Sequence, residues 1–354
     1  MDAILLVGGF GTRLQPLTKT RPKPMIPLAN VPFVARTAQW LCDAGVDHII
    51  LSLHYNADQF MRYFSQLSLN VDISFAVEGS PLGTGGAIKN CEPFLRSSRC
   101  FIFNGDIFTN LDLAKMLKAH ERAGAAVSLA LSEVEDPSRF GVIETDMQGR
   151  ILSFTEKPPR ELARSRDINA GIYIFERAIL DQFPQEPCSV ERDIFPKLLA
   201  RDYPMLGYRE WPYWTDLGTP ADYLQAHRDI LARKVRIPLQ GREISPGTWM
   251  GERVRVADTA LIRPPVILGD DAIVESCATI GPAVVLGSHA CIEADALVED
   301  SILWEYAVLR RDSTLRGSIL GQYSVASGDH SGCICEDYGQ VIRQQKAMLS
   351  REAA

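Results

Sequence analysis

The sequence lacks the features of several common protein classes. Its 354 residues contain no apolar run long enough for a membrane helix. The first residues also do not show the pattern of a secretory signal, which is a basic region followed by an apolar stretch and a cleavage site. The eight cysteines are scattered, with only Cys333 and Cys335 close together, so no spacing indicates zinc. A net charge of −7 without a basic stripe disfavours general nucleic-acid binding. We therefore expect a cytoplasmic globular protein with thiol cysteines and neither a nucleic-acid nor a membrane partner.

Two frequent phosphate-binding motifs are also missing. A dinucleotide fingerprint would have glycine where this chain has Leu14, and no Gly-Lys-Ser/Thr of a Walker loop is present. Instead, a glycine-rich stretch over residues 8–11 follows the apolar run 3–7, which predicts a buried parallel strand. Bare backbone at the end of such a strand can approach phosphate oxygens. Because Arg13 and Lys23 add positive charge, the sequence predicts a triphosphate site.

The chain is long enough for two domains. Over residues 1–233 short apolar runs alternate with helical patterns, which predicts a Rossmann-like α/β domain with a mostly parallel sheet. A final helix is expected from Thr219 and Pro220, an N-cap residue followed by proline at the first helical position. The expected strands are 3–7, 49–53, 71–75, 100–103 and 127–131, and the expected helices are 34–44 and 111–123.

A linker over residues 234–250 precedes a different pattern. Small or apolar residues recur at every sixth position in two rows, which predicts a left-handed parallel β-helix of hexapeptide repeats over 251–322. The first row is Leu268, Val274, Ile280, Leu286, Ile292 and Val298, and the second is Ala272, Ala278, Val284, Ala290, Ala296 and Ile302.

The repeat loosens from Trp304 onward, where Arg310 and Arg316 stand at the apolar position. We expect an end cap or an interface there rather than further coils, followed by a tail over 323–354. Trp304, Tyr306 and Leu309 would expose large apolar groups, so the sequence predicts a homo-oligomer formed through this domain.

The segment GGFGTRLxPLTxxxPKPMxPL over residues 8–28 resembles the signature of the sugar-nucleotide pyrophosphorylases, nucleotidyltransferases that join a nucleoside triphosphate to a sugar 1-phosphate. The resemblance covers residues 1–233, and the hexapeptide repeats match the longer members. Further on, residues 78–87 look like the base-recognition loop of this family, Asn104-Gly105-Asp106 like its first metal carboxylate, and residues 214–218 like the segment with the second. The resemblance implies Mg²⁺ held by Asp106, Asp216 and the triphosphate.

The resemblance also implies roles for individual residues. Arg13 would neutralise the leaving pyrophosphate, Lys23 the α-phosphate and Lys157 the phosphate of the sugar. No general base is needed, because a phosphate nucleophile is already ionised near neutral pH. The implied nucleotide-binding residues are Leu6, Gly8, Gly9, Gly11, Thr12, Arg13, Lys23, Glu78, Gly83, Thr84 and Asp106. Those implied for the sugar phosphate are Gly141, which would leave space for the sugar ring, Glu156, Lys157, Asn169 and Asp216.

Glu78 bears on the choice of base. Guanine offers two adjacent donors that suit a carboxylate, whereas uracil and thymine present a carbonyl. The alternative is that Glu78 faces solvent and the backbone of residues 83–86 reads the base. The loop resembles the guanylyl-transferring branch, so the expected reaction joins GTP and mannose 1-phosphate to give GDP-mannose and pyrophosphate. Gly85 stands where mannose enzymes more often have alanine, which leaves a heptose 1-phosphate open.

Three other functions remain as alternatives. One is a thymidylyl-, uridylyl- or adenylyltransferase for glucose 1-phosphate. Another is a catalytically silent regulatory subunit that binds sugar nucleotide, which the full set of charged residues disfavours. The third is a hexapeptide acyltransferase, for which His289 is the only candidate base within the repeats.

Overall fold

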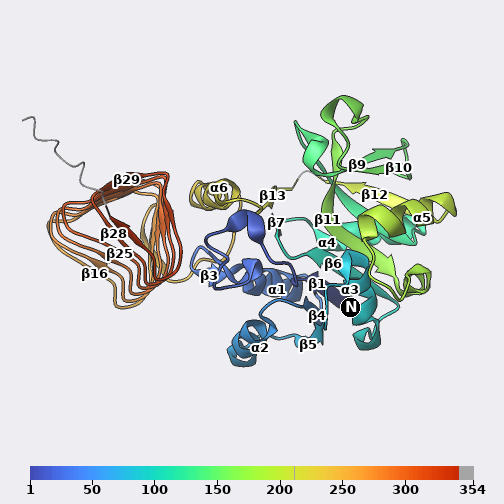
Figure 1. Cartoon of the computed structure of the whole chain (residues 1–354), viewed down its shortest axis with the longest axis horizontal. Coiled ribbons are helices and arrows are strands. Elements are labelled where there is room, and N and C mark those ends of the chain that lie inside the picture. The colour runs from blue at the N-terminus through green and yellow to red at the C-terminus, as the bar shows by residue number, and fades with distance from the viewer. Residues whose placement is uncertain (211, 343–354) are drawn as a thin grey trace, which may run out of the picture. The chain divides into compact units, whose positions relative to one another are not determined.

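The computed structural model describes residues 1–210 and 212–342, which divide into two compact units (Figure 1). The first unit comprises Met1–Thr12, Arg21–Ile26 and Pro32–Gly218, and the second comprises Arg13–Thr20, Pro27–Val31 and the chain from Thr219 onward. The signature segment therefore contributes to both units. Within the described ranges, no helix combines the length and apolarity required to cross a membrane.

The first unit is built on a nine-stranded mixed sheet with the order β10-β9-β11-β6-β1-β4-β5, in which β8 pairs with β11 and with β12. The central strands β6, β1, β4 and β5 are parallel, as the sequence predicts, whereas β11 runs antiparallel to β6. The strands are β1 (Asp2–Leu6), β4 (His48–Leu53), β5 (Asp72–Val77), β6 (Arg99–Asn104), β8 (Val127–Glu133), β9 (Gly141–Thr145), β10 (Ile151–Glu156), β11 (Asp167–Glu176) and β12 (Met205–Arg209).

Helices cover both faces of this sheet, because successive residues of a strand point to opposite sides. Ile4 of β1 belongs to the apolar core under α3 and α5, whereas Ala3 and Leu5 belong to the core under α1, α2 and α4. The helices are α1 (Phe33–Asp43), α2 (Ala57–Gln66), α3 (Gly83–Cys91), α4 (Leu113–Ala123) and α5 (Phe195–Ala200). Two short pairs complete the strands before residue 218: β2 (Pro27–Leu28) with β3 (Val31–Pro32), and β7 (Ile107–Thr109) with β13 (Trp214–Asp216).

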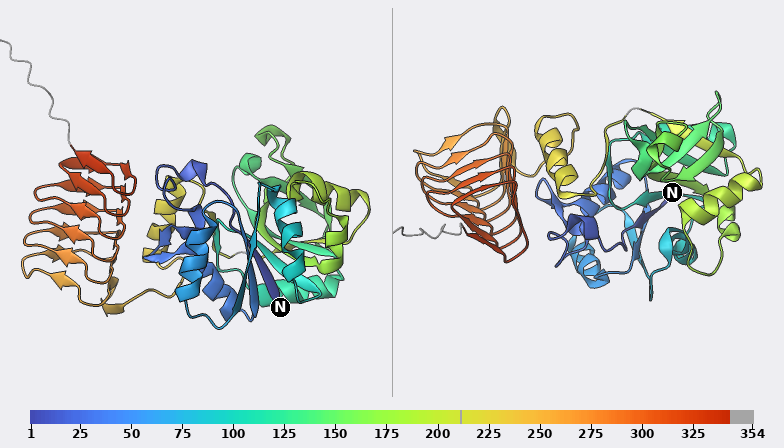
Figure 2. Two further views of the ribbon diagram at one scale, coloured as in Figure 1. Left: turned by 60° about the horizontal axis from the view of Figure 1, so that its bottom comes forward. Right: turned by 45° about the horizontal axis from the view of Figure 1, so that its top comes forward.

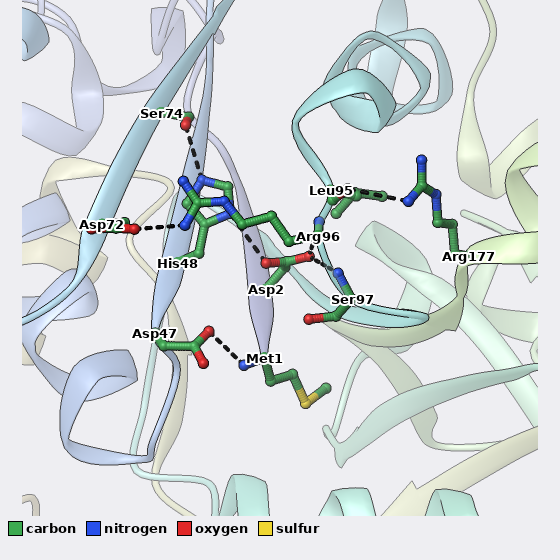
Figure 3. Close-up of polar contacts among 10 residues, drawn as sticks. All are labelled: Met1, Asp2, Asp47, His48, Asp72, Ser74, Leu95, Arg96, Ser97 and Arg177. Atoms are coloured by element: carbon green, nitrogen blue, oxygen red, sulfur yellow. Dashed lines mark hydrogen bonds and ion pairs between the residues drawn. The ribbon is translucent and has the colours of Figure 1, made fainter.

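A buried polar cluster joins the amino-terminal ends of the parallel strands (Figure 3). The carboxylate of Asp2 accepts hydrogen bonds from the backbone N–H groups of Arg96 and Ser97, each at 2.7 Å. It also lies 3.1 Å from His48 Nδ1, while His48 Nε2 lies 2.9 Å from Ser74 Oγ. These contacts link β1, β4 and β5 to the loop before β6, so they hold the sheet at the edge opposite the carboxyl ends of the strands.

The second unit contains α6 (Pro220–Leu231) and a parallel β-helix. Thr219 caps α6 as predicted: its hydroxyl accepts from the N–H of Asp222, whose carboxylate accepts from the N–H of Thr219. This reciprocal pair is a capping box, which satisfies two backbone donors at the start of the helix.

The β-helix is left-handed and has three faces, each a parallel sheet (Figure 2). The first sheet consists of β14 (Arg242–Ser245), which pairs antiparallel at its edge, β15 (Thr248–Met250), β18 (Val266–Leu268), β21 (Val284–Leu286), β24 (Ile302–Leu303), β27 (Ile319–Leu320) and β30 (Ile334–Cys335). The second consists of β16 (Arg255–Val256), β19 (Ile273–Val274), β22 (Cys291–Ile292), β25 (Val308–Leu309), β28 (Val325–Ser327) and β31 (Gln340–Ile342). The third consists of β17 (Leu261–Ile262), β20 (Thr279–Ile280), β23 (Leu297–Glu299), β26 (Thr314–Arg316) and β29 (Asp329–Ser331). Every residue of the two predicted rows is at most 2% exposed, which confirms the hexapeptide repeat up to Val298. Ile302 pairs with Val285 rather than with Val284, so it is already one position out of its row.

The expected end cap after Trp304 is wrong, because the coils continue to β31 with a shorter repeat. Contacts between neighbouring coils span 18 residues early in the β-helix, then 17 and finally 15. Because the coil that first spans 17 residues is one residue shorter, the inward-facing positions after it come one residue earlier than a count of six predicts. Leu309 and Leu315 therefore fill the interior, and Arg310 and Arg316 point outward. The strands run from Arg242 to Ile342, beyond the boundaries of 251 and 322 expected from the repeat; residues 343–354 of the expected tail lie outside the described residues.

Two of the three residues expected to expose apolar surface are buried. Trp304 is 2% exposed and donates its indole N–H to the hydroxyl of Tyr223 at 3.0 Å, and Leu309 is fully buried inside the coil. Only Tyr306 is exposed, at 38%. The homo-oligomer stays a prediction, but most of the surface proposed for it is used within the second unit.

Candidate active site

The two predicted metal carboxylates meet at one buried lysine. Lys23 Nζ donates to Asp106 Oδ2 at 2.7 Å and lies 3.5 Å from Asp216 Oδ1. Lys23 is 8% exposed, and the side chains of Asp106 and Asp216 are 29% and 14% exposed. Pairing of β13 with β7 places Asp216 opposite Ile107, the residue after Asp106. Three distant segments thus assemble one charged cluster within the first unit.

This cluster suits a divalent cation shared with a phosphate ligand. Among the described residues, no group of three or more His, Cys, Asp or Glu side chains is arranged to hold a metal by itself. Magnesium, however, is usually bound by one or two carboxylates together with substrate phosphates and water. Because Asp106 and Asp216 already face one ammonium group, their oxygens can also face a cation that a triphosphate helps to bind. The residues present therefore fit the metal that the family resemblance implies.

The glycine-rich loop lies beside this cluster, at the carboxyl end of β1. The backbone N–H of Gly105 donates to the carbonyl of Leu6 at 3.0 Å, and a Cβ at Gly105 would lie 2.5 Å from that oxygen. Only glycine permits this approach, which brings the turn with Asp106 against the end of β1. Gly11 adopts a φ of +63°, a conformation that glycine reaches without strain. Gly8 and Gly9 belong to the same loop and Thr12 directly follows it; their contacts with a nucleotide stay predictions.

Arg13 is exposed and lies in the short 3₁₀ helix Thr12–Leu14 that follows the loop. Its contacts assign it to the second unit, together with residues 14–20. The predicted contact of Arg13 with pyrophosphate therefore stays a prediction.

Glu78 is 9% exposed, so the alternative in which it faces solvent is wrong. Its Oε1 accepts from the hydroxyl of Ser52 at 3.2 Å, and its Oε2 accepts from the backbone N–H of Leu82 at 3.1 Å. The carboxylate thus holds the loop that leads into α3, a role absent from the sequence analysis. A carboxylate has about four acceptor positions, so these two bonds leave capacity for a ligand.

The segment that the family resemblance assigns to base recognition packs on Cys188. Gly85 N–H donates to the carbonyl of Cys188 at 2.8 Å, and a Cβ at Gly85 would lie 2.5 Å from Cys188 Sγ. Gly83, at the start of α3, has a φ of +70° and would meet the same carbonyl. Packing therefore explains why this chain has glycine at position 85, where mannose enzymes more often have alanine. The sulfur atom of Cys188 lies too close for the methyl group of an alanine.

Thr84 also holds this loop in place. Its hydroxyl accepts from the N–H of Val190 at 2.9 Å and donates to Glu191 Oε2 at 2.7 Å. These two bonds use the donor and one of the two acceptor positions of the hydroxyl, and the contact of Thr84 with a nucleotide stays a prediction.

The residues expected to bind the sugar phosphate lie on the β9–β10 hairpin and on β11. Lys157 has a φ of +49° and its Nζ lies 3.2 Å from Glu156 Oε1; their side chains are 56% and 18% exposed. Gly141 does not leave space for a sugar ring as expected. A Cβ there would lie 2.4 Å from Phe154 Cζ and 3.1 Å from Glu156 Oε2, so these side chains occupy that space.

Asn169 stabilises a bulge in β11. The pairing of β11 with β8 shifts register between Asn169 and Tyr173, with Gly171 between them at a φ of +75°. Asn169 Oδ1 accepts from the N–H of Gly171 at 3.0 Å, and its Nδ2 donates to the hydroxyl of Tyr173 at 2.9 Å. Burial raises the pKa of Tyr173 well above its usual value, so the phenol stays neutral.

An aromatic pair that was not predicted from the sequence lies beside these residues. Trp214 and Phe140 meet edge to face with ring centroids 5.7 Å apart, and the indole N–H of Trp214 donates to the carbonyl of Ala170 at 2.9 Å. A signal was present, because Trp214 precedes Asp216 by two positions in a strand and therefore shares its face. Phe140 could also have been noticed, because it directly precedes Gly141, a residue already expected in the sugar site.

Comparison with known proteins agrees with this geometry. The family model described as nucleotidyl transferase matches residues 2–233, more than half of the chain, so the chain belongs to this family. A mannose-1-phosphate guanylyltransferase from Mycobacterium tuberculosis is 39% identical over 267 residues, which cover 71% of this chain and 73% of the relative. A UTP–glucose-1-phosphate uridylyltransferase from Synechocystis is 33% identical over 326 residues, covering 87% and 84%. The chain is a sugar-1-phosphate nucleotidyltransferase.

Solved structures resemble about two thirds of this chain. HddC from Yersinia pseudotuberculosis is 33% identical and has a TM-score of 0.57, with 64% of this chain and 97% of that chain covered. A second structure of HddC, complexed with GMP-PN, has a TM-score of 0.56.

Proposed function

We propose that this protein joins GTP and mannose 1-phosphate to form GDP-mannose and pyrophosphate. The observation that carries the choice of GTP is the buried carboxylate of Glu78 at the head of the loop before α3. Its remaining acceptor positions match the two adjacent donors of guanine, and an ionised carboxylate would repel the carbonyl edge of uracil or thymine. The relative from Mycobacterium tuberculosis and the complex of HddC with GMP-PN support the same choice.

The choice of mannose gains support from the packing of Gly85. An unusual glycine in this loop would favour a heptose substrate only if it enlarged the sugar site. Here Cys188 Sγ takes the space beside Gly85, so the glycine gives no reason to prefer a heptose. The uridylyltransferase from Synechocystis, which aligns over a larger share of this chain, makes UTP with glucose 1-phosphate the second candidate pair.

In the proposed reaction an oxygen of the sugar phosphate attacks the α-phosphorus in line, and pyrophosphate leaves. Lys157 and Asn169 would hold the sugar phosphate, Lys23 would neutralise the α-phosphate and Arg13 the departing pyrophosphate. The nucleophile is already ionised near neutral pH, so no side chain needs to remove a proton.

Asp106 and Asp216 would hold Mg²⁺ together with phosphate oxygens of the nucleotide. The metal would supply neutralisation of the charge on the phosphates. Lys23 orients both carboxylates through the contacts at 2.7 and 3.5 Å and offsets part of their mutual repulsion.

The experiment that tests this function measures pyrophosphate release by the purified protein with Mg²⁺. Each of GTP, UTP, dTTP and ATP is paired with mannose, heptose or glucose 1-phosphate. We expect the highest kcat/KM for GTP with mannose 1-phosphate, and Asp106→Asn as the inactive control. A higher kcat/KM for UTP with glucose 1-phosphate would replace the proposed pair by the second candidate.

Two further expectations belong to this proposal. We place the enzyme in the cytoplasm, because all eight cysteines are free thiols and a reducing compartment keeps them so. Burial raises the pKa of Cys91 to about 12, which makes this thiol unreactive. The homo-oligomer would use the exposed outer faces of the β-helix.

A further inference from the structure

The segment before Lys23 is bound to the last described coil of the β-helix. Within the second unit, Thr20 donates its hydroxyl to Asp337 Oδ2, and Lys19 Nζ lies 2.7 Å from Glu336 Oε2. Lys19 and Glu336 are about half exposed, so their ion pair contributes little at physiological salt. The hydrogen bond to Asp337, which is 8% exposed, is the stronger of the two contacts.

The segment after Lys23 is held by the same unit. Ala29 N–H donates to His227 Nε2 on α6 at 3.0 Å, and Asn30 Nδ2 donates to the carbonyl of Leu286 on β21 at 2.8 Å. Lys23 therefore lies in a short stretch, Arg21–Ile26, whose two flanks both belong to the second unit.

The same attachment extends to Arg13. Residues 13–20 form a compact piece in which Leu14 and Leu17 are at most 1% exposed. Two turns stiffen it: Leu17 N–H donates to the carbonyl of Leu14 at 3.1 Å, and Lys19 N–H to that of Pro16 at 3.2 Å. Because Arg13 and Thr20 are the two ends of this piece, a hydrogen bond at Thr20 restricts the movement of Arg13.

Asp337 is itself held rigidly. Its Oδ1 accepts from the backbone N–H of Gln322 at 2.7 Å. The next residue, Tyr338, stacks on Tyr323 with ring centroids 5.1 Å apart and planes within 13°. That stack continues through Tyr306 to His289 at one corner of successive coils. The carboxylate of Asp337 is thus ordered by the coil and presents its second oxygen to Thr20.

Asp270 occupies the same position of an earlier coil as Asp337 but lacks the hydrogen bond to Thr20. Its Oδ1 accepts from the N–H of Glu252, one coil earlier, at 2.7 Å, as Asp337 does from Gln322. Among the described residues, Asp270 makes no hydrogen bond or ion pair to residues 13–20. The backbone bond is therefore a general feature of this position, and the bond to Thr20 is particular to Asp337.

We infer that Asp337 is a positioning residue for phosphate binding: through Thr20 it holds the segment that ends in Arg13, so the β-helix sets the position of this cation. The inference rests on the proposed function only in the role given to Arg13. It assigns the β-helix a part in binding pyrophosphate, in addition to any role in assembly.

Calorimetric titration of the full chain with inorganic pyrophosphate in the presence of Mg²⁺ tests this inference. Thr20→Val removes the hydroxyl and keeps the shape of the side chain, so we expect about tenfold weaker binding, the order of one hydrogen bond to a charged group. Asp337→Ala should weaken binding by the same factor. Asp270→Ala, which loses the equivalent backbone bond, should bind pyrophosphate as the wild type does.

A second variant shows whether the effect passes through Arg13. In an Arg13→Ala background, Thr20→Val should cause no further loss of affinity. An unchanged affinity in Thr20→Val, an equal loss in Asp270→Ala, or a full additional loss in the Arg13→Ala background would each overturn the inference. Wild-type protein that binds pyrophosphate in this way but transfers no guanylyl group would instead refute the proposed function alone.

Discussion

Because Gly85 packs on Cys188, we expect a larger side chain at position 85 to destabilise the protein. A methyl group at position 85 would lie 2.5 Å from Cys188 Sγ, about 1 Å closer than an ordinary van der Waals contact. Relieving such overpacking costs about 1–3 kcal/mol, and better helix propensity of alanine offsets at most about 1 kcal/mol of it. We expect Gly85→Ala to lower the free energy of unfolding by about 1–2 kcal/mol, or the melting temperature by roughly 2–8 °C.

The assay is a double-mutant cycle with Cys188→Ala, followed by thermal and denaturant unfolding. Once the sulfur is absent, Gly85→Ala should cost less, because the closest remaining neighbour is the carbonyl oxygen of Cys188, at 3.1 Å. Gly79→Ala is the matched control in the same loop, since a Cβ there meets nothing within 4 Å. An equal cost of Gly85→Ala in both backgrounds would refute the packing argument. A change of preference from mannose to heptose 1-phosphate, or the reverse, in the double variant would show that Gly85 selects the sugar.

Three further predictions concern the charged residues. Asp106→Asn and Asp216→Asn should each lower Mg²⁺-dependent turnover at least about a hundredfold, the loss typical of removed electrostatic stabilisation, and near-normal activity of either variant would exclude the metal site. Arg13→Ala should mainly reduce kcat, whereas Lys157→Ala should mainly raise KM for the sugar 1-phosphate; the same kinetic defect in both would contradict their separate roles. Glu78→Gln should reduce kcat/KM for GTP by about ten- to a hundredfold and relax selection against UTP, and an unchanged selectivity would remove Glu78 from base recognition.

The β-helix shows where sequence periodicity succeeds and where it fails. Leu286 and Val298 could be predicted as interior residues because each coil repeats the same direction of the side chain at a fixed interval. Between Val298 and Leu303 the coil loses one residue, and a pattern counted in sixes then falls on Arg310 instead of Leu309. Pairing between coils, which a periodic count does not contain, decides which of the two points inward.

In the active site, too, some features could be predicted from the sequence and others could not. Asp106 and Asp216 could be identified because each lies in a recognisable motif, and their convergence followed from the resemblance. Their shared contact with Lys23 depends on the pairing of β7 with β13, which no local pattern reveals. The bond from Leu82 to Glu78 and the contact between Gly85 and Cys188 likewise arise from tertiary packing.

A competition experiment between nucleotides tests whether the enzyme is a guanylyltransferase. The purified protein is given Mg²⁺, mannose 1-phosphate and equal concentrations of GTP, UTP, dTTP and ATP, and the sugar nucleotides formed are separated and weighed by mass spectrometry. We expect GDP-mannose as the main product, at least about tenfold above any other, which is the discrimination expected from one mismatched buried polar contact. A main product that carries uridine, thymidine or adenosine would contradict it.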